Sequence, residues 1–354
     1  MRALRLMDWK SEPVMSEVPE PVPGPGEVVI QVGGAGACHS DLHLMSDFEP
    51  GELAWNPPFT LGHENAGWVY RTGQGVSGLS PGQPVAVCGA WGCGTCSRCR
   101  VGIEIYCENP TGAPVPGGGG GLGLDGGMAD YLLVPDSRFL VPLPDGLDPL
   151  HAAPLTDAGL TPYHAIRRSL RLLTPDATAV VIGAGGLGHL AAQILKVTSP
   201  ATVVVVDPLQ SARDLALMHG ADLVVAPGED LVDTIREHAH GRGADLVLDF
   251  VGSDTSLAAA AASTRPLGDL TIVGIAGGTL PVSFFGVPFE VSIQTTYWGT
   301  RQELGEVLAL AARKLIRPDV HEYSLEEAPE AYRRLRAGEV AGRAVVVPVP
   351  SYNG

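Results

Sequence analysis

Gly183-Ala184-Gly185-Gly186-Leu187-Gly188 directly follows the apolar run Ala179-Val180-Val181-Ile182 and opens a stretch with helical spacing. This is the pattern Gly-x-Gly-x-x-Gly placed between a strand and a helix, the context that gives the pattern its meaning. Gly183 permits a tight turn, Gly185 lets the backbone approach a pyrophosphate, and Gly188 lets the helix pack on the strand. The stretch therefore predicts the first strand, turn and helix of a dinucleotide-binding sheet.

An acidic residue stands at the end of the next strand candidate. Thr202-Val203-Val204-Val205-Val206 is followed by Asp207, about twenty residues beyond the glycine pattern. A carboxylate at this place can accept hydrogen bonds from the ribose hydroxyls of NAD and repels the 2′-phosphate of NADP. We therefore expect NAD(H) as the cofactor. The alternative is that Asp207 is an ordinary turn residue before Pro208.

The second half of the chain alternates strands with helices. Further continuous apolar runs, as strands buried on both faces require, lie at residues 223–225, 246–248 and 270–273. Helical patterns fill the gaps at residues 187–197, 211–219, 230–239 and 256–263. Such alternation predicts an α/β fold with a doubly wound parallel sheet.

The first half has a different pattern, with short alternating or β-branched runs and clusters of Pro and Gly between them. The runs lie at residues 27–32, 66–70, 84–87 and 131–134. This pattern predicts a barrel-like β domain. After two helical stretches at 301–314 and 325–337, the chain closes with an isolated strand at 342–347, which we expect to return to the β domain. We therefore predict a β domain of residues 1–157 and 299–354, interrupted by an α/β domain of residues 158–298.

Composition limits the classes of partner. The chain has 354 residues, 45% hydrophobic and 18% charged, which suits a globular protein of two domains. Its formal charge of -16 disfavours nucleic acid and anionic membranes, because both need basic patches, so we expect a small-molecule partner. The first ten residues lack the apolar core of a signal peptide, and no run reaches the length of a membrane span. A cytoplasmic protein is expected.

All six cysteines lie between Cys38 and Cys107, which favours metal binding over disulfides in a cytosolic chain. Cys93, Cys96, Cys99 and Cys107 supply four thiolates, enough to close a tetrahedral zinc site. An iron–sulfur cluster is the alternative metal centre. The ferredoxin pattern has three residues before its last Cys and a Pro after it, whereas here seven residues precede Cys107 and Glu108 follows it. Disulfides and plain core thiols are the remaining alternatives.

A second candidate metal site is built from separate stretches. Cys38-His39-Ser40-Asp41-Leu42-His43 and Gly62-His63-Glu64 would bring a thiolate and an imidazole together from two strand ends and leave zinc under-coordinated, as in a catalytic site. Asp157, at the junction of the two halves, is the third candidate ligand. The alternatives are a buried hydrophobic Cys, a satisfied polar His, and an Asp that caps a helix.

These motifs, together with Gly342-Arg343 near the end of the chain, recur in the same order in the zinc-dependent medium-chain alcohol dehydrogenases. The resemblance covers essentially the whole chain. It is closest to the bacterial NAD-dependent group that acts on secondary alcohols, ketones and aryl aldehydes, through residues 156–164 and 296–300. The resemblance implies a Rossmann sheet inserted in a GroES-like β-barrel catalytic domain.

The resemblance also implies roles for the candidate metal residues. Cys38, His63 and Asp157 would be the catalytic zinc ligands, and Glu64 would be a nearby carboxylate that coordinates transiently. Asp41 would orient the ring of His63. Many family members have Cys where Asp157 stands, so this ligand set has an oxygen donor in place of a sulfur donor. A structural zinc in the four-cysteine site would bring the total to two zinc ions per subunit.

Roles in proton transfer, cofactor binding and substrate binding follow from the same resemblance. Ser40 would contact the substrate oxygen, and His43 would end a proton relay through the nicotinamide ribose. Thr161 would pack on the nicotinamide, and Arg343 would meet the pyrophosphate. Positions that commonly line the substrate pocket, each of which could equally be core or subunit interface, are Trp55, Leu122, Tyr297 and Trp298.

The sequence therefore predicts a zinc-dependent, NAD(H)-dependent oxidoreductase that interconverts a secondary or aryl alcohol and its carbonyl compound. A formaldehyde- or polyol-type dehydrogenase has the same zinc and NAD chemistry and differs only in its pocket. A non-catalytic dinucleotide-binding protein of this fold is the remote alternative, which loss of the three zinc ligands would have indicated. The family resemblance favours a homotetramer over a homodimer.

Overall fold

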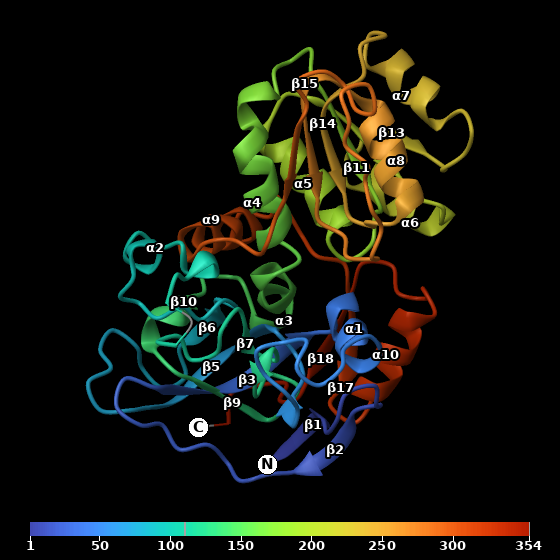
Figure 1. The fold of residues 1–354 in the computed structure, drawn as a ribbon. Helices are drawn as coiled ribbons and strands as arrows, with labels where there is room; N and C mark the ends of the chain where they lie inside the picture. The colour runs from blue at the N-terminus through green and yellow to red at the C-terminus, as the bar shows by residue number, and fades with distance from the viewer. Residues whose placement is uncertain (110, 354) are drawn as a thin grey trace. The chain divides into compact units, whose positions relative to one another are not determined.

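A computed structural model describes residues 1–109 and 111–353. The chain divides into two compact units (Figure 1). The first unit combines Met1–Leu160, Trp298–Lys314 and Pro318–Gly354, and the second combines Thr161–Tyr297 and Leu315–Arg317. In sequence, the second unit is thus inserted within the first.

The second unit contains a six-stranded parallel sheet. Its strands are β11 (Thr178–Ile182), β12 (Thr202–Val206), β13 (Leu223–Val225), β14 (Ala244–Asp249), β15 (Thr264–Ile272) and β16 (Ser292–Thr295). They lie in the order β13-β12-β11-β14-β15-β16, and every neighbouring pair is parallel. This is the order of a Rossmann sheet, with the direction of winding reversing between β11 and β14. The prediction of a doubly wound parallel sheet is confirmed.

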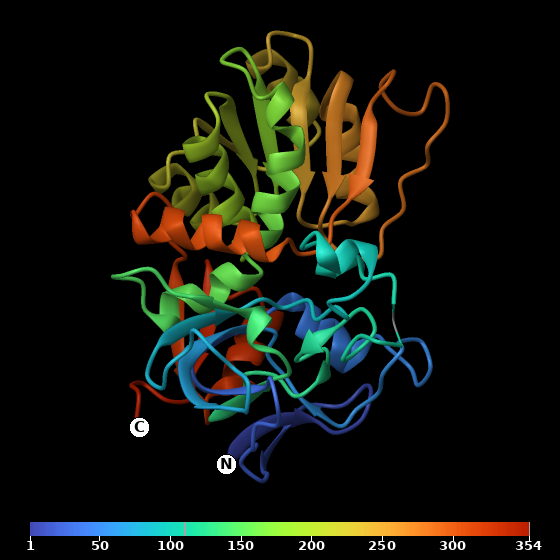
Figure 2. The same cartoon turned by 90° about the vertical axis from the view of Figure 1, so that its left-hand side faces the viewer.

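Helices cover both faces of this sheet (Figure 2). They are α4 (Leu160–Ser169), α5 (Gly188–Thr198), α6 (Gln210–Met218), α7 (Leu231–His238) and α8 (Asp254–Ser263), with a short 3-10 turn at Leu170–Leu172. α5 packs on α6 and α7 packs on α8. The strand side chains between these two layers, such as Val180, Val204 and Val247, are fully buried. Burial on both faces explains why the strands are continuous apolar runs in the sequence.

The first unit is mainly antiparallel β structure. A seven-stranded sheet contains β3 (Val28–Gly36), β5 (Glu64–Thr72), β6 (Pro84–Val87), β9 (Tyr131–Val134), β10 (Leu140–Pro142), β17 (Val320–Ser324) and β18 (Arg343–Val347). Smaller sheets contain β1 (Arg2–Leu6), β2 (Val14–Glu17) and β4 (Phe59–Thr60), and β7 (Gly119–Gly120) and β8 (Gly123–Leu124). The closing strand β18 pairs with β3, so the end of the chain does return to the β unit.

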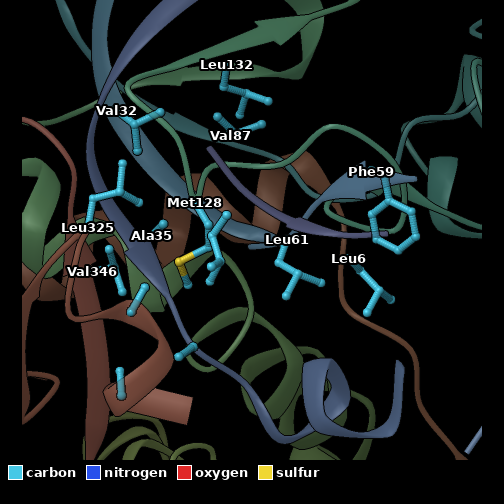
Figure 3. Packing of buried hydrophobic residues seen from close by; sticks show 14 of the residues in the cluster. Leu6, Val32, Ala35, Phe59, Leu61, Val87, Met128, Leu132, Leu325 and Val346 are labelled. Atoms are coloured by element: carbon cyan, nitrogen blue, oxygen red, sulfur yellow. The ribbon is translucent and has the colours of Figure 1, made fainter. Parts of the chain in front are cut away.

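The apolar core of the first unit lies between its sheets and helices (Figure 3). Leu6, Phe59, Met128 and Leu132 are among its fully buried side chains. The helices of the unit are α1 (His39–Ser46), α2 (Ser97–Arg100), α3 (Pro149–Ala152), α9 (Arg301–Ala312) and α10 (Ala328–Arg336), with 3-10 turns at Glu104–Tyr106, Ser137–Phe139 and Ala153–Thr156. No helix among the described residues is both long and apolar enough to cross a membrane.

Strand pairing in this unit brings distant residues together at one point. Gly36, the last residue of β3, is the partner of Glu64 at the start of β5 and of Val345 in the middle of β18. Cys38 follows the end of β3 and is the N-cap of α1, while His63 immediately precedes β5. The register of the sheet therefore places both residues beside the same strand ends.

Candidate active site and metal centres

Cys38, His63, Glu64 and Asp157 form one group, here called the buried cluster, in which one ligand atom from each residue lies within 4.8 Å of the others. All four residues are buried. His63 Nε2 lies 3.6 Å from Asp157 Oδ2. Tetrahedral zinc with nitrogen and oxygen ligands at about 2.1 Å separates two ligand atoms by about 3.4 Å. The donor types and their spacing therefore fit a zinc ion.

Asp157 is brought to the buried cluster by the 3-10 turn at Ala153–Thr156, which it directly follows. Helix α4 begins only at Leu160, so Asp157 is not the N-cap residue of that helix. The structure therefore places the carboxylate among the other candidate ligands.

Electrostatics inside the buried cluster favour deprotonated Cys38. Burial raises the pKa of the Cys38 thiol, but the charge of Arg343 and the contact with His63 outweigh it and lower the pKa to about 7. Burial lowers the pKa of His63, whereas the charge of Asp41 and hydrogen bonds to Asp157 and Asp41 raise it well above its ordinary value. A thiolate beside imidazole and carboxylate groups is the donor set of a catalytic zinc site.

Glu64 is paired with Arg343 inside the same group. Arg343 Nε donates to Glu64 Oε2 at 2.8 Å and Nη2 donates to Oε1, and both side chains are buried. A Cβ atom on Gly36 would lie 1.8 Å from Glu64 Oε2, so only glycine leaves room for this carboxylate. Burial raises the pKa of Glu64 to about 8, although Arg343 opposes this shift. The guanidinium that the resemblance assigns to the pyrophosphate is thus hydrogen-bonded to Glu64 in this structure.

The candidate relay residues lie on one side of helix α1. Ser40 and His43 are three residues apart, a spacing that places side chains on the same helix face. Ser40 Oγ lies 3.3 Å from His63 Nε2, the ring nitrogen that faces Asp157. The other nitrogen of His63, Nδ1, lies 3.0 Å from Asp41 Oδ1. His43 Nδ1 is hydrogen-bonded to Asp47, and its ring is partly exposed.

Three of the four candidate pocket residues lie in the first unit. Trp298 is buried, and its ring lies 6.0 Å from the ring of His63 at an interplanar angle of 66°. Leu122 packs against the small apolar group that contains Trp298. Trp55 stacks edge-on against Phe59 at a centroid distance of 5.4 Å. Of these side chains, the ring of Trp298 thus lies beside the buried cluster.

The backbone conformation of Trp298 is unusual, with a φ of 46°. Bulky residues rarely adopt this left-handed region, and such strain is concentrated at functional sites. Tyr297, the fourth candidate pocket residue, belongs to the second unit and is 38% exposed.

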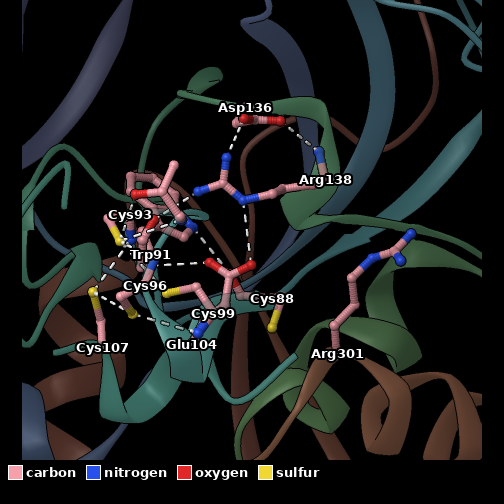
Figure 4. Close-up of polar contacts among 12 residues, drawn as sticks. Cys88, Trp91, Cys93, Cys96, Cys99, Glu104, Cys107, Asp136, Arg138 and Arg301 are labelled. Atoms are coloured by element: carbon pink, nitrogen blue, oxygen red, sulfur yellow. Dashed lines mark hydrogen bonds and ion pairs between the residues drawn. The ribbon is translucent and has the colours of Figure 1, made fainter. Parts of the chain in front are cut away.

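Cys93, Cys96, Cys99 and Cys107 form a second group, here called the four-cysteine lobe (Figure 4). The sulfur atoms of Cys93 and Cys99 lie 3.9 Å apart, as do those of Cys96 and Cys107. Tetrahedral zinc with sulfur ligands at about 2.3 Å separates two sulfurs by about 3.8 Å. The lobe therefore has the spacing of a closed four-thiolate zinc site.

Backbone N–H groups point at the sulfur atoms of the lobe. Cys93 Sγ accepts hydrogen bonds from the backbone of Thr95 and Cys96 and from the hydroxyl of Thr95, at 3.3–3.4 Å. These bonds, with that from the Thr95 side chain the largest cause, lower the pKa of Cys93 to about 5. Burial raises the pKa of Cys99 to about 12, a shift that a bound metal ion would have to overcome.

The lobe is held to the rest of the unit by residues that the sequence analysis did not single out. Arg138 Nη2 donates to the carbonyl of Gly92 at 2.6 Å, and Arg138 Nε donates to Glu104 at 3.2 Å (Figure 4). Glu104 in turn accepts from the backbone N–H of Gly92 at 3.1 Å. Gly92 immediately precedes Cys93, so this pair fixes the start of the lobe. Nothing in the local sequence links Arg138 to a segment that lies about forty residues earlier.

Cys88 belongs to neither group of candidate ligands. It follows strand β6, is buried, and has a pKa that burial raises to about 12. A thiol in such surroundings is inert.

The glycine loop has the geometry that its sequence requires. Gly183 has a φ of +88°, and a Cβ atom on Gly188 would lie 1.8 Å from the carbonyl oxygen of Gly183. A Cβ atom on Gly185 would meet no atom within 4 Å, so this exposed position leaves space for a ligand. Gly186 and Leu187 complete the loop before α5 begins. Thr161 lies in the same unit, buried in the first turn of α4.

Asp207 supports the glycine loop from the neighbouring strand. Its Oδ2 accepts a hydrogen bond from the backbone N–H of Ala184 at 2.8 Å, and its Oδ1 accepts from Leu209 at 2.8 Å. The carboxylate is buried. It therefore has a structural contact inside the loop, in addition to the acceptor capacity that ribose hydroxyls would use.

Comparisons with known proteins agree with both units. The alcohol dehydrogenase GroES-like domain matches residues 24–145, and the zinc-binding dehydrogenase family matches residues 186–313. An NAD-dependent alcohol dehydrogenase of Sulfurisphaera tokodaii is 36% identical, covering 98% of this chain and all of that protein. A D-arabinose 1-dehydrogenase (NADP(+)) of Saccharolobus solfataricus is 33% identical, covering 96% of this chain and 95% of that protein.

A solved structure agrees with the same assignment. The crystal structure of the alcohol dehydrogenase of the archaeon Aeropyrum pernix is 36% identical, covers 98% of this chain and all of that one, and superposes with a TM-score of 0.90. Identity at this level over the full length of both proteins shows common descent as well as a common fold. The chain belongs to the zinc-dependent medium-chain alcohol dehydrogenase family.

Proposed function

We propose that this enzyme uses NAD(H) and zinc to interconvert a secondary or aryl alcohol and its ketone or aldehyde. Membership of the family establishes an oxidoreductase that acts on alcohols. The observation that supports the finer proposal is the position of the Trp298 ring beside His63 of the buried cluster. An apolar, aromatic wall at the candidate metal site suits an aryl or branched apolar substituent on the reacting carbon.

The buried cluster would hold the catalytic zinc through Cys38, His63 and Asp157, and the four-cysteine lobe would hold the structural zinc. When bound, zinc polarises the oxygen of the substrate and NAD accepts the hydride. Ser40 Oγ, which lies beside His63 Nε2, accepts the proton of the substrate hydroxyl while it gives its own proton to the relay. His43 takes up a proton at the end of the relay, and its Nδ1 is hydrogen-bonded to the carboxylate of Asp47.

Arg343 and Glu64 have proposed roles that depend on each other. The guanidinium is paired with Glu64 and lowers the pKa of Cys38, so it stabilises the thiolate that zinc needs. Contact of Arg343 with the cofactor pyrophosphate and transient coordination by Glu64 both require this pair to loosen. The two expected roles are therefore coupled, because each frees one partner of the same ion pair.

The cofactor is proposed to bind the second unit, within the expected domain of residues 158–298, with Gly183, Gly185 and Gly188 at the pyrophosphate. Asp207 supports NAD, and so does the name of the Sulfurisphaera relative, whereas the Saccharolobus relative is named for NADP(+).

Asp207→Ala should weaken the binding of NADH by on the order of ten- to a hundredfold, because charge-assisted hydrogen bonds to the ribose contribute about 1.5–3 kcal/mol. Asp207→Asn is the control that keeps an acceptor for Ala184 and loses the charge. A wild-type enzyme that prefers NADPH would refute the assignment.

The substrate class is tested by following NADH consumption with aliphatic ketones, acetophenones, aldehydes and aldoses, with chiral analysis of the alcohols formed. We expect the acetophenones to have the highest kcat/KM. The D-arabinose relative favours a sugar or polyol substrate as the second candidate. Higher kcat/KM for aldoses would establish that candidate instead.

A homotetramer is the proposed assembly, and a homodimer is the alternative. Support comes from an exposed apolar group at the edge of the parallel sheet, where Phe284, Phe285 and Phe289 are more than half exposed close before edge strand β16. Exposed patches of this kind mark protein interfaces. Size-exclusion chromatography with light scattering gives the subunit number, and a monomer at micromolar concentration would contradict the proposal.

A cytoplasmic location is also proposed. Six free thiols, all described by the structure, fit this location, because disulfides are rare in the cytosol.

A further inference from the structure

We propose that Tyr332, on the C-terminal helix α10, is a positioning residue for the buried cluster, because its hydroxyl holds the carboxylate that orients His63. Tyr332 Oη donates to Asp41 Oδ2 at 2.9 Å. Both side chains are fully buried, with 1% and 0% of their surfaces exposed. The two residues are separated by 291 positions and meet where α10 packs on α1.

Asp41 connects two of the candidate zinc ligands. Its Oδ1 lies 3.0 Å from His63 Nδ1, and its Oδ2 accepts the backbone N–H of Cys38 at 3.0 Å. One carboxylate therefore fixes the ring of one ligand and the backbone of the other. The hydroxyl of Tyr332 is the third donor to this carboxylate, and no fourth is found among the described residues.

The hydroxyl of Tyr332 determines how firmly this carboxylate is held. Asp41 lies in the first turn of α1, and without Tyr332 the backbone N–H of Cys38 would be the only donor to its Oδ2, at the end of a side-chain bond that rotates easily. A second donor on Oδ2 fixes the plane of the carboxylate, so Oδ1 points at His63 Nδ1. With Nδ1 donating its proton to Asp41, His63 would present the lone pair of Nε2 to a bound zinc ion.

The arrangement is more than filling of space. Phenylalanine would fill the same volume in the core between α10 and the sheet, so packing alone does not require the hydroxyl. A buried hydroxyl without an acceptor is destabilising, and here its acceptor is a carboxylate that contacts a candidate zinc ligand. The hydroxyl and the carboxylate therefore belong to one network that ends at the metal site.

The experiment is Tyr332→Phe in the full-length enzyme, with metal binding as the first readout. Zinc affinity is measured by competition with a chelator, and Co²⁺ replaces zinc for absorption spectra. Zinc binding and cobalt absorption that are lost in Cys38→Ser are assigned to the buried cluster. Loss of a residue that hydrogen-bonds to a metal ligand lowers metal affinity by about 10- to 100-fold. Because Tyr332 acts on His63 only through Asp41, we expect about tenfold weaker metal binding and a shifted cobalt spectrum.

Tyr323→Phe is the matched control. Tyr323 is also buried in this unit, and its hydroxyl accepts a hydrogen bond from Arg334 of α10, but it has no contact with Asp41. We expect wild-type metal affinity and cobalt spectrum for this variant. Asp41→Asn should weaken zinc binding at least as much as Tyr332→Phe, because it removes the charge that orients His63.

Two results would overturn the inference. One is a Tyr332→Phe enzyme that binds metal with wild-type affinity and spectrum, even if its thermal stability falls. The other is an equal loss of affinity in Tyr323→Phe, which would indicate a general effect of loosening α10. The inference rests on the proposed catalytic zinc, and a wild-type protein that binds no metal at the buried cluster would instead refute that proposed function.

Discussion

The two metal centres of the first unit are built in opposite ways. The four-cysteine lobe takes all its donors from one segment, residues 93–107, and local backbone N–H groups already point at its sulfurs. The buried cluster takes its donors from residues 38, 63, 64 and 157, which meet because β3 and β5 pair in register and the 3-10 turn at Ala153–Thr156 packs on both strands. The lobe is thus a property of a short segment, and the cluster is a property of the whole unit.

The same difference appears in how each centre favours thiolate. In the lobe, hydrogen bonds from Thr95 and neighbouring backbone lower the pKa of Cys93 to about 5. In the buried cluster, burial opposes the Cys38 thiolate, and the charges of Arg343 and His63 are needed to bring its pKa to about 7. Polar local contacts suit a permanent metal site, whereas a balance of buried charges suits a site where charge changes during reaction.

The largest effect should come from Cys38→Ser. Zinc contributes several kcal/mol of transition-state stabilisation, so loss of this ligand should lower kcat on the order of a thousandfold. The folded structure should persist, because the strands around the buried cluster pair without the metal. Steady-state kinetics measures kcat, and thermal melting shows whether the fold persists. Elemental analysis measures the zinc content, which should fall from two ions per subunit to one.

Cys88→Ser is the matched control for this change, because Cys88 is also a buried thiol but belongs to neither centre. It should keep both zinc ions and nearly full kcat. A Cys38→Ser enzyme with wild-type kcat, or a Cys88→Ser enzyme that loses zinc, would contradict the division into two centres.

Cys96→Ser should have its main effect on stability. A closed site that loses one of four ligands no longer holds its metal, so the local structure that depends on the metal is lost. We expect the thermal midpoint, at a fixed scan rate, to fall by on the order of 10 °C, with kcat per folded molecule changed less than about threefold. Loss of activity equal to that of Cys38→Ser, with an unchanged midpoint, would mean that the two centres do not divide these tasks.

The sequence was informative where the structure is local. The spacing of Cys93, Cys96 and Cys99 and the pattern from Gly183 to Gly188 lie within single turns, so the chain alone indicated what they form. Helices were also predicted to within a few residues: α6 was expected at 211–219 and is Gln210–Met218. The rest depended on family resemblance, because no local spacing relates Cys38 to Asp157.

Contacts between distant segments could not be predicted in this way. Arg343 and Glu64 are 279 positions apart, and their pairing follows from the register of β18 on β3 and of β3 on β5. The family resemblance implies that Arg343 contacts the cofactor, and no sequence pattern indicates its ion pair with Glu64. A Tyr on an amphipathic helix such as α10 is ordinarily a packing residue, and only the structure shows its carboxylate acceptor.

Arg138 offers a smaller test of how the lobe is held. Arg138→Met removes the side-chain hydrogen bonds to Gly92 and Glu104, together with the ion pair to Asp136, and leaves the four sulfurs in place. A charge-assisted hydrogen bond contributes about 2 kcal/mol, so the midpoint should fall by about 3 °C, less than in Cys96→Ser. Arg98→Met is the control, because Arg98 pairs with Glu108 on the exposed surface of the same lobe and should change the midpoint by less than about 1 °C. Equal shifts in the two variants would show that the interior contacts of Arg138 are not what holds the lobe.

The smallest expected effect concerns His43, which lies outside both centres, one helical turn beyond Ser40 on the same face of α1. Imidazole is the commonest general base in proteins, and His43→Gln removes one while it leaves the zinc ligands and the glycine loop intact. Asp47 loses its hydrogen-bond partner in this variant, and an exposed carboxylate is too weak a base to replace an imidazole near neutral pH. Alcohol oxidation should therefore fall by about tenfold near pH 6 and by less than about twofold near pH 9, where solvent species take the proton.

Added imidazole buffer should restore much of the rate of His43→Gln near pH 6, because a small base can take the proton from the relay directly. His238→Gln replaces an exposed histidine on α7 and is the control. It should leave the pH profile unchanged, so imidazole should have no effect on it. Cofactor and zinc binding should stay at wild-type levels in both variants, since neither ring contacts a metal ligand. If the His43→Gln profile overlays that of the wild type, the proton leaves by another path and the effect of α1 on catalysis ends at Ser40.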